Sequence, residues 1–97
     1  MSEEKVKALL GFANKAGKLA LGRSAVYSSH QKDKLCAIVL AKDASVKVEE
    51  MMKALKIEHF YFGTKDSLGQ LFGRDKVGVI GLLDHGFTQS IRQALIE

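Results

Sequence analysis

The 97-residue sequence has no proline and only one cysteine, Cys36. A single cysteine cannot form a disulfide framework within the chain, which excludes a disulfide-stapled domain. No apolar run approaches the roughly 18 residues that a membrane span needs. The charged start, residues 1–7, is not followed by the apolar stretch of a secretory signal. These absences predict a single small, soluble, cytoplasmic domain that spans residues 1–97 and does not contact a membrane.

Positive charge is concentrated in the first third of the sequence. The chain has 15 Lys and Arg against 11 Asp and Glu, a formal net charge of +4. Residues 1–34 contain seven basic and three acidic side chains, whereas residues 35–97 contain eight of each. No acidic residue lies between Lys5 and Lys32. Such a local excess can attract phosphate, although a solvated surface explains a charge of this size equally well.

Helical and strand patterns alternate along the whole chain. Glycine and small polar residues mark the boundaries, because proline is absent. We expect strands near residues 19–21, 35–41, 59–63 and 77–83, where short apolar or alternating runs occur. We expect helices to begin at the capping residues Ser2, Ser24, Asp43 or Ser45, Thr64 and Asp84. This order is typical of an α/β sandwich, in which a sheet lies between layers of helices.

No residues in the sequence have the spacing of a catalytic or metal site. None of His30, His59 and His85 has a second metal-binding residue at a suitable spacing on the same element. Cys36 opens an apolar strand with no Lys, Arg or His placed to lower its pKa, so we expect it to fill space in the core. We therefore expect no enzymatic activity, no metal and no cofactor.

Two expected helix starts combine a glycine with a basic residue, Gly22-Arg23-Ser24 and Gly63-Thr64-Lys65. Free N–H groups at a helix start attract anions, and a nearby cation strengthens that attraction. The second run lacks the upstream glycine of a phosphate-binding Walker loop, so an ordinary strand-to-helix turn also explains it. Together with the acid-free segment, the two runs favour contact with a nucleic-acid backbone.

Three motifs resemble one family in their order and spacing. They are Ala16–Leu19 followed by Gly22, then Ile38–Asp43, then Thr64–Gly69 followed by Gly73. The family is the kink-turn-binding ribosomal protein superfamily of the L-seven-A-e and L-thirty-e type. The later run Leu83–Phe87 resembles its bacterial YlxQ-type branch. This resemblance covers roughly residues 9–87. It implies a three-layer αβα sandwich with a mixed four-stranded sheet, and binding to kink-turn RNA.

The resemblance also implies where RNA would bind, at the start of the second helix. The family motif there is Gly-x-Asn-Glu-x-x-Lys. Gly22 matches it, but Ser24, Ala25 and Ser28 stand where Asn, Glu and Lys are expected. The two serines still offer hydrogen bonds, whereas Ala25 offers none. Each bidentate base contact contributes about 1–3 kcal/mol, so these changes weaken specific binding unless other residues replace the contacts.

Other positions complete the implied RNA-binding site. Lys18 and Arg23 are the local candidates for replacement contacts. Lys32, Asp43 and Lys65 flank the RNA face of the family. Val77 is the large apolar side chain of the loop 73–78, which corresponds to the family's base-pocket loop.

Two functions from different classes compete. The first is an RNA-binding module of ribosome assembly or translation, with structured RNA as its partner and ribosomal or translation proteins as further partners. The second is a protein-interaction module that keeps the fold and has lost specific RNA binding. The retained Gly22 and the local positive charge favour the first, and the changes at Ser24, Ala25 and Ser28 favour the second. An enzyme that uses a bound nucleotide is a third reading, for which the sequence offers no catalytic residues.

Overall fold

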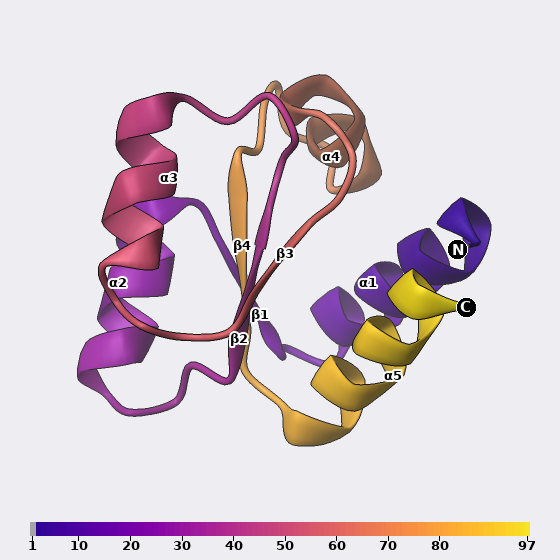
Figure 1. The fold of residues 1–97 in the computed structure, drawn as a ribbon. Coiled ribbons are helices and arrows are strands. Elements are labelled where there is room, and N and C mark those ends of the chain that lie inside the picture. Colours follow the sequence, from indigo (N-terminus) through magenta and orange to yellow (C-terminus); the bar gives the residue numbers. More distant parts are fainter. Residues whose placement is uncertain (1) are drawn as a thin grey trace.

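Five helices and four strands alternate along residues 2–97, the part of the chain that the computed structural model describes (Figure 1). The helices are α1 (Glu3–Lys15), α2 (Arg23–Gln31), α3 (Val46–Lys53), α4 (Lys65–Leu71) and α5 (His85–Ile96). The strands are β1 (Leu19–Leu21), β2 (Ala37–Leu40), β3 (His59–Tyr61) and β4 (Val79–Leu82). Every expected helix and strand is present, with ends that differ by a few residues.

The four strands form one mixed sheet in the order β1-β4-β2-β3. Strand β2 pairs with β3 in parallel and with β4 in antiparallel fashion, and β4 also pairs with β1 in antiparallel fashion. All residues of the two central strands, β2 and β4, are buried. Burial on both faces explains why their sequences are continuous apolar runs rather than alternating ones.

The sheet lies between two helical layers (Figure 1). Helices α2 and α3 cover one face, and α1 and α5 cover the other, where α4 also packs. On the α1/α5 side, the fully buried side chains include Val6, Leu10, Val39, Ile80 and Ile91. On the α2/α3 side, they include Val26, Ile38, Leu40 and Met52. The expected three-layer αβα sandwich with a mixed four-stranded sheet is confirmed.

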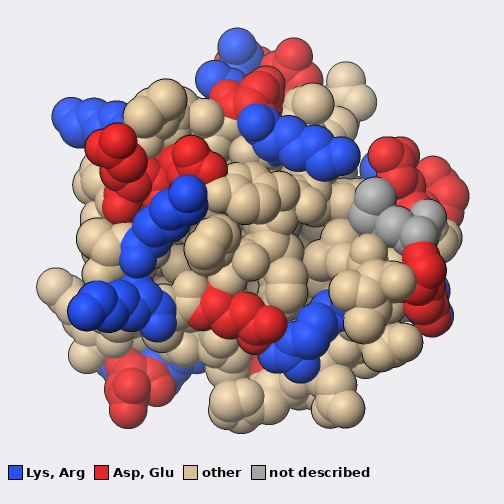
Figure 2. Space-filling view, in the orientation of Figure 1, with Lys and Arg blue, Asp and Glu red and all other residues tan. Residues whose placement is uncertain are grey.

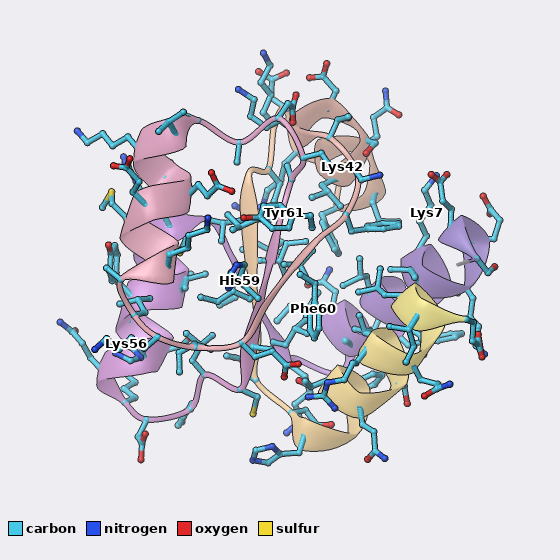
Figure 3. The ribbon with its side chains drawn as sticks, in the orientation of Figure 1. Lys7, Lys42, Lys56, His59, Phe60 and Tyr61 are labelled. Atoms are coloured by element: carbon cyan, nitrogen blue, oxygen red, sulfur yellow. The ribbon has the colours of Figure 1, made fainter. Side chains whose placement is uncertain are left out.

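Strand β3 forms one edge of the sheet, and its side chains alternate between the two layers (Figure 3). Phe60 points to the α1/α5 side, whereas His59 and Tyr61 point to the α3 side. The Tyr61 hydroxyl donates a hydrogen bond to the Glu49 carboxylate of α3. This hydrogen bond lowers the pKa of Glu49 and raises that of Tyr61. The edge strand is therefore attached to the helical layer through a side chain.

Helix α2 lies close against β4 because Gly81 has no side chain. A Cβ atom on Gly81 would lie 2.8 Å from Leu35 Cδ1 and 3.3 Å from both Ala20 Cβ and Val26 Cγ2. Side-chain carbon atoms do not approach one another to 2.8 Å in a packed core. The absence of this one side chain therefore lets the residues that follow β1 pack directly onto the centre of the sheet.

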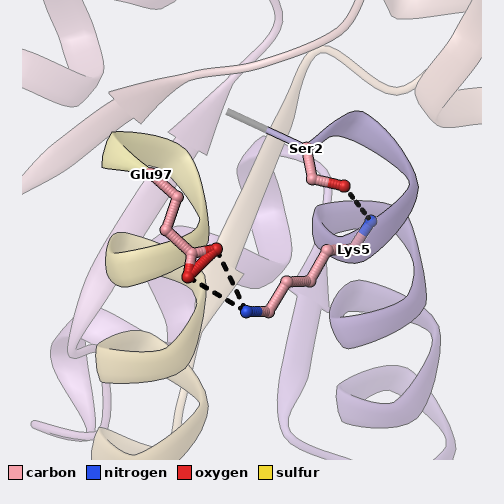
Figure 4. Close-up of polar contacts among 3 residues, drawn as sticks. All are labelled: Ser2, Lys5 and Glu97. Carbon is pink, nitrogen blue, oxygen red and sulfur yellow. Dashed lines mark hydrogen bonds and ion pairs between the residues drawn. The ribbon is translucent and has the colours of Figure 1, made fainter.

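The ends of the described chain lie side by side on the α1/α5 layer (Figure 4). Lys5 Nζ contacts both carboxylate oxygens of Glu97, at 3.0 and 3.1 Å. Ser2 Oγ accepts a hydrogen bond from the Lys5 backbone N–H at 3.3 Å and so caps α1, as its position in the sequence predicts. The ion pair is exposed, and pairs of this kind contribute about 0–1 kcal/mol to stability. Packing, rather than this pair, holds the two helices together.

Three local expectations are wrong. Gly22, not Ser24, is the N-cap of α2. Ser45 caps α3 by accepting a hydrogen bond from Val48 N–H, so Asp43 does not cap that helix. Cys36 lies just before β2 and is only partly buried, so it is not a core residue of the strand. Its pKa is raised by partial burial and, to a smaller degree, by the charge of Asp84.

Thr88 tests the packing of the α1/α5 layer. It is the one polar residue in the buried core of residues 2–97, at 3% exposure, and its Oγ1 has no hydrogen-bond partner among them. We expect Thr88→Val to raise the free energy of unfolding by about 1 kcal/mol, because it removes an unpaired buried hydroxyl. Chemical denaturation measures this change. Thr88→Ser is the matched control, since it keeps the hydroxyl and removes the methyl group, and it should lower stability by about 1 kcal/mol. A Thr88→Val protein less stable than the wild type would show that the hydroxyl is paired in solution.

Candidate nucleic-acid interface

Helix α2 begins at a glycine whose backbone conformation other residues rarely adopt. Gly22 has φ 91° and ψ 164°, a region of the backbone map that is essentially restricted to glycine. Its N–H donates to the Val79 carbonyl at 3.0 Å, which holds the start of α2 against the start of β4. No side chain of the described residues caps this helix. The first N–H groups of α2 are therefore free to bind an anion from solution.

A hollow of about 230 Å³ lies beside this helix start. We call it the Arg23 hollow. Its four basic lining residues come from three parts of the chain and are Arg23, Lys65, Arg74 and Lys76. Its apolar lining residues are Ala44, Val48, Val77 and Val79. The remaining lining residues, Gly22, Ser45 and Gly78, are uncharged, so no acidic residue between 2 and 97 lines the hollow. Four cations around an apolar surface suit a ligand with both a planar apolar part and a phosphate.

The loop that carries Arg74 and Lys76 is held on α4 by backbone contacts. Arg74 N–H donates to the Gly69 carbonyl at 2.7 Å, and Val77 N–H donates to the Lys65 carbonyl at 3.0 Å. A Cβ atom on Gly69 would lie only 2.7 Å from the Arg74 carbonyl oxygen and 2.6 Å from the Asp75 carbonyl oxygen. The loop lies this close to the helix because residue 69 is a glycine. The absence of a side chain at Gly69 therefore determines where Arg74 and Lys76 lie.

Asp43 organises the start of α4. Its Oδ1 accepts a hydrogen bond from the Lys65 backbone N–H at 2.8 Å, across 22 residues of sequence. Thr64 and Ser67 form a capping box at the same helix start. The carboxylate thus satisfies a free N–H group at the positive end of a helix, an arrangement that stabilises both. We interpret Asp43 as a residue that positions Lys65, although the resemblance places it near the RNA face.

The structure brings together four of the site residues expected from the sequence. Gly22, Arg23, Lys65 and Val77 all line the Arg23 hollow. Val77 is 3% exposed, so it belongs to the wall of the hollow and the core rather than to a protruding loop. Ser24 and Ser28 are exposed on α2, one turn apart.

Lys18 and Lys32 do not join this group. Lys18 precedes β1 and lines a different hollow, and Lys32 is the C-cap of α2. Because α2 has nine residues, its two ends are about 13 Å apart. Figure 1 shows α2 running from the end near the α4–β4 loop to the end near the start of β2. Lys18 and Lys32 therefore lie apart from Arg23 rather than beside it at the start of the helix.

Sequence reasoning missed Arg74 and Lys76. Both are exposed and lie in the loop between α4 and β4, which the family resemblance already associated with the base pocket. Two basic residues within three positions of such a loop were the available signal. This signal is weak because Asp75 lies between the two basic residues and lowers the net charge of residues 74–76 to +1.

The face of the molecule shown in Figure 2 has no extended patch of basic side chains. On this face, which contains the β3 edge, basic and acidic side chains alternate. No helix of residues 2–97 combines the length and the apolar character needed to cross a membrane. Within the same residues, no three His, Cys, Asp or Glu side chains are grouped so that they could hold a metal ion.

This chain is similar to known proteins in sequence and in fold, although no family model matches it. The sequence is 27% identical over 100 residues to the RNA-binding protein YlxQ of Enterococcus faecium, which covers 99% of this chain and 95% of that protein. The fold matches a solved structure of a protein of unknown function from Bacillus halodurans with a TM-score of 0.85. That match has 26% identity and covers 96% of this chain and 98% of the other. The chain thus resembles, over nearly its whole length, a protein named for RNA binding.

Gly69→Ala tests how the cationic loop is positioned. We expect this substitution to lower the free energy of unfolding by about 1–3 kcal/mol, because its Cβ overlaps two backbone carbonyl oxygens. We also expect the loop 74–76 to shift, which amide chemical shifts would detect. Gly11→Ala is the matched control, because Gly11 lies in α1 with nothing within 4 Å of a built Cβ. That control should raise stability by about 0.5–1 kcal/mol. Equal effects of the two substitutions would contradict the close approach at Gly69.

Proposed function

We propose that this protein binds RNA at the start of α2 and in the Arg23 hollow, and that its target is a sharply bent RNA of the kink-turn type. The observation that carries the proposal is the set of four basic residues around an apolar hollow beside a helix start that no side chain caps. The similarity to the RNA-binding protein YlxQ supports the same class of ligand. A role in ribosome assembly or translation is part of the proposal and follows from the resemblance to ribosomal kink-turn binders.

Each part of the site has a role in binding. The side chains of Arg23, Arg74 and Lys76 are exposed, so they can reach phosphates on either side of the hollow. The apolar walls, which include Val48 and Val77, can pack against the face of an unstacked base. The free N–H groups at the start of α2 can donate to a phosphate or to the acceptor edge of a guanine.

A bent RNA fits this site better than a regular duplex does. The major groove of A-form RNA is deep and narrow, so side chains do not reach its bases. A kink opens the groove and leaves a base unstacked. The end of α2 can then enter the groove while the unstacked base occupies the Arg23 hollow. A straight duplex offers only its phosphates, which the same cations attract without specificity.

The changed positions on α2 alter the balance of contacts. Ser24 and Ser28 are exposed and can each make one hydrogen bond, whereas Ala25 makes none. We therefore infer that phosphate contacts supply most of the affinity. Binding of this kind decreases steeply with salt, by about 0.7–0.9 in the logarithmic slope for each phosphate contact.

Arg23→Ala tests the proposal most directly. We expect it to weaken binding to a kink-turn RNA about tenfold or more, the equivalent of about 1.4 kcal/mol, while binding to a straight duplex of equal length changes less. Lys76→Ala should weaken binding to both RNAs and reduce the salt slope by about 1. Fluorescence titrations at two salt concentrations measure both effects.

Lys7→Ala is the control for the loss of one positive charge. Lys7 is on α1 and does not line the Arg23 hollow (Figure 3). We expect this variant to bind like the wild type. Equal binding of the kinked and straight RNAs by the wild-type protein would reduce the interaction to diffuse charge attraction. If neither RNA binds at low salt, the proposal is wrong, and that result favours the protein-interaction module as the function.

A further inference from the structure

A second and larger hollow lies at the other end of α2. It has a volume of about 640 Å³, and we call it the Cys36 hollow. Its lining residues come from the segment before β1, the α2–β2 connection and the β4–α5 turn. They are Gly17, Lys18, Asp33, Lys34, Leu35, Cys36, Leu83 and His85. They include two lysines, Lys18 and Lys34, and two leucines, Leu35 and Leu83.

Half of the local charge excess of residues 1–34 lies at this end, where three lysines and Asp33 sum to +2. Lys18 and Lys34 line the hollow, and Lys32 is the adjacent C-cap of α2. All three side chains are exposed, and the three ion pairs found in residues 2–97 involve other cations. Asp84 caps α5, where its Oδ2 accepts the Phe87 N–H at 2.9 Å, and its charge also acts on Cys36 in this hollow. Asp33 is the one acidic lining residue of this hollow in the described chain.

Backbone hydrogen bonds hold the lysines in fixed turns. Lys34 N–H donates to the Ser29 carbonyl at 2.9 Å, which closes the end of α2. Asp33 adopts φ 59°, the left-handed conformation that this closing turn needs. Leu83 N–H donates to the Lys18 carbonyl at 2.9 Å and ties that segment to the sheet. The cations are therefore presented on a rigid frame, so ordering them on binding costs little backbone entropy.

We propose that the Cys36 hollow and its surrounding lysines form a second RNA contact, which takes a ribose-phosphate segment distinct from the one at the Arg23 hollow. This inference rests on the proposed function, because it assigns a second contact to the same class of partner. Lysines act as mobile point charges toward phosphates and do not select bases. Leu35 and Leu83 offer apolar contact for the ribose. The two contacts lie at opposite ends of α2, so the protein joins two RNA segments.

Cys36 provides a direct probe of this contact. It is the only cysteine of the chain, it lines the hollow, and it is partly exposed. Alkylation by iodoacetamide is measured at about pH 8.5, since the raised pKa of Cys36 slows the reaction at neutral pH. We expect a saturating kink-turn RNA to slow alkylation several-fold in the wild-type protein.

The Lys18→Ala/Lys34→Ala double variant tests the cations. We expect it to lose most of the protection of Cys36 and to reduce the salt slope of binding by about 1.4–1.8, the value for two lost phosphate contacts. The control is Lys7→Ala/Lys42→Ala, which removes the same charge from residues that line neither hollow. Protection is compared with and without RNA within each variant, so that a change in the reactivity of Cys36 itself does not affect the result.

Failure of this inference differs from failure of the proposed function. If Arg23→Ala weakens RNA binding but Cys36 alkylates at the same rate with and without RNA, the second contact is wrong and the proposed function stands. If the double variant keeps both the protection and the salt slope, the lysines do not contact RNA and the inference is again wrong. If no RNA binds to the wild type, both fail together.

Discussion

The backbone turn at Gly22 determines where the proposed contacts lie. Its positive φ lets the chain end β1 and enter α2 within one residue, while its N–H remains bonded to Val79. The start of α2 is thereby placed against the beginning of β4 and the loop that precedes it. Gly81 then allows the helix to lie flat on the sheet. One short helix consequently connects both hollows and sets their separation.

Most of the fold could be predicted from the sequence because its signals are local. Continuous apolar runs mark β2 and β4, and the capping residues Ser2, Thr64 and Asp84 mark three helix starts. One of the wrong expectations involves a partner that is distant in sequence. Asp43 looked like a cap for the helix that follows it, but its carboxylate bonds to the N–H of Lys65. A pattern of neighbouring residues cannot predict a hydrogen bond between residues 22 positions apart.

The candidate site was harder to predict because several parts of the chain build it. Gly22 and Arg23 could be found from their position before a helix, and they do line one hollow with Lys65. Lys18 is close to them in sequence, yet the intervening strand β1 carries it to the other end of the sheet. Arg74 and Lys76 reach the hollow only because Gly69 allows a close approach of two backbones, which is a tertiary property.

The number of charged residues in a sequence segment does not predict where positive charge gathers on the folded surface. The basic third of the sequence supplies Lys18, Lys32 and Lys34 to one end of α2 but only Arg23 to the other. The other three cations of the Arg23 hollow come from residues 35–97, whose charges sum to zero.

A neutral segment can build a cationic site when its acidic side chains do not line that site. Asp43 accepts a backbone N–H at the start of α4, Asp66 lies in the first turn of that helix, and Asp84 caps α5. Carboxylates held at helix starts are stabilised by the partial positive charge there. These carboxylates are fixed at helix starts, whereas the side chains of Arg23, Arg74 and Lys76 are exposed around the hollow. This local arrangement of charges, rather than a large net charge, is what makes the Arg23 hollow suited to phosphate.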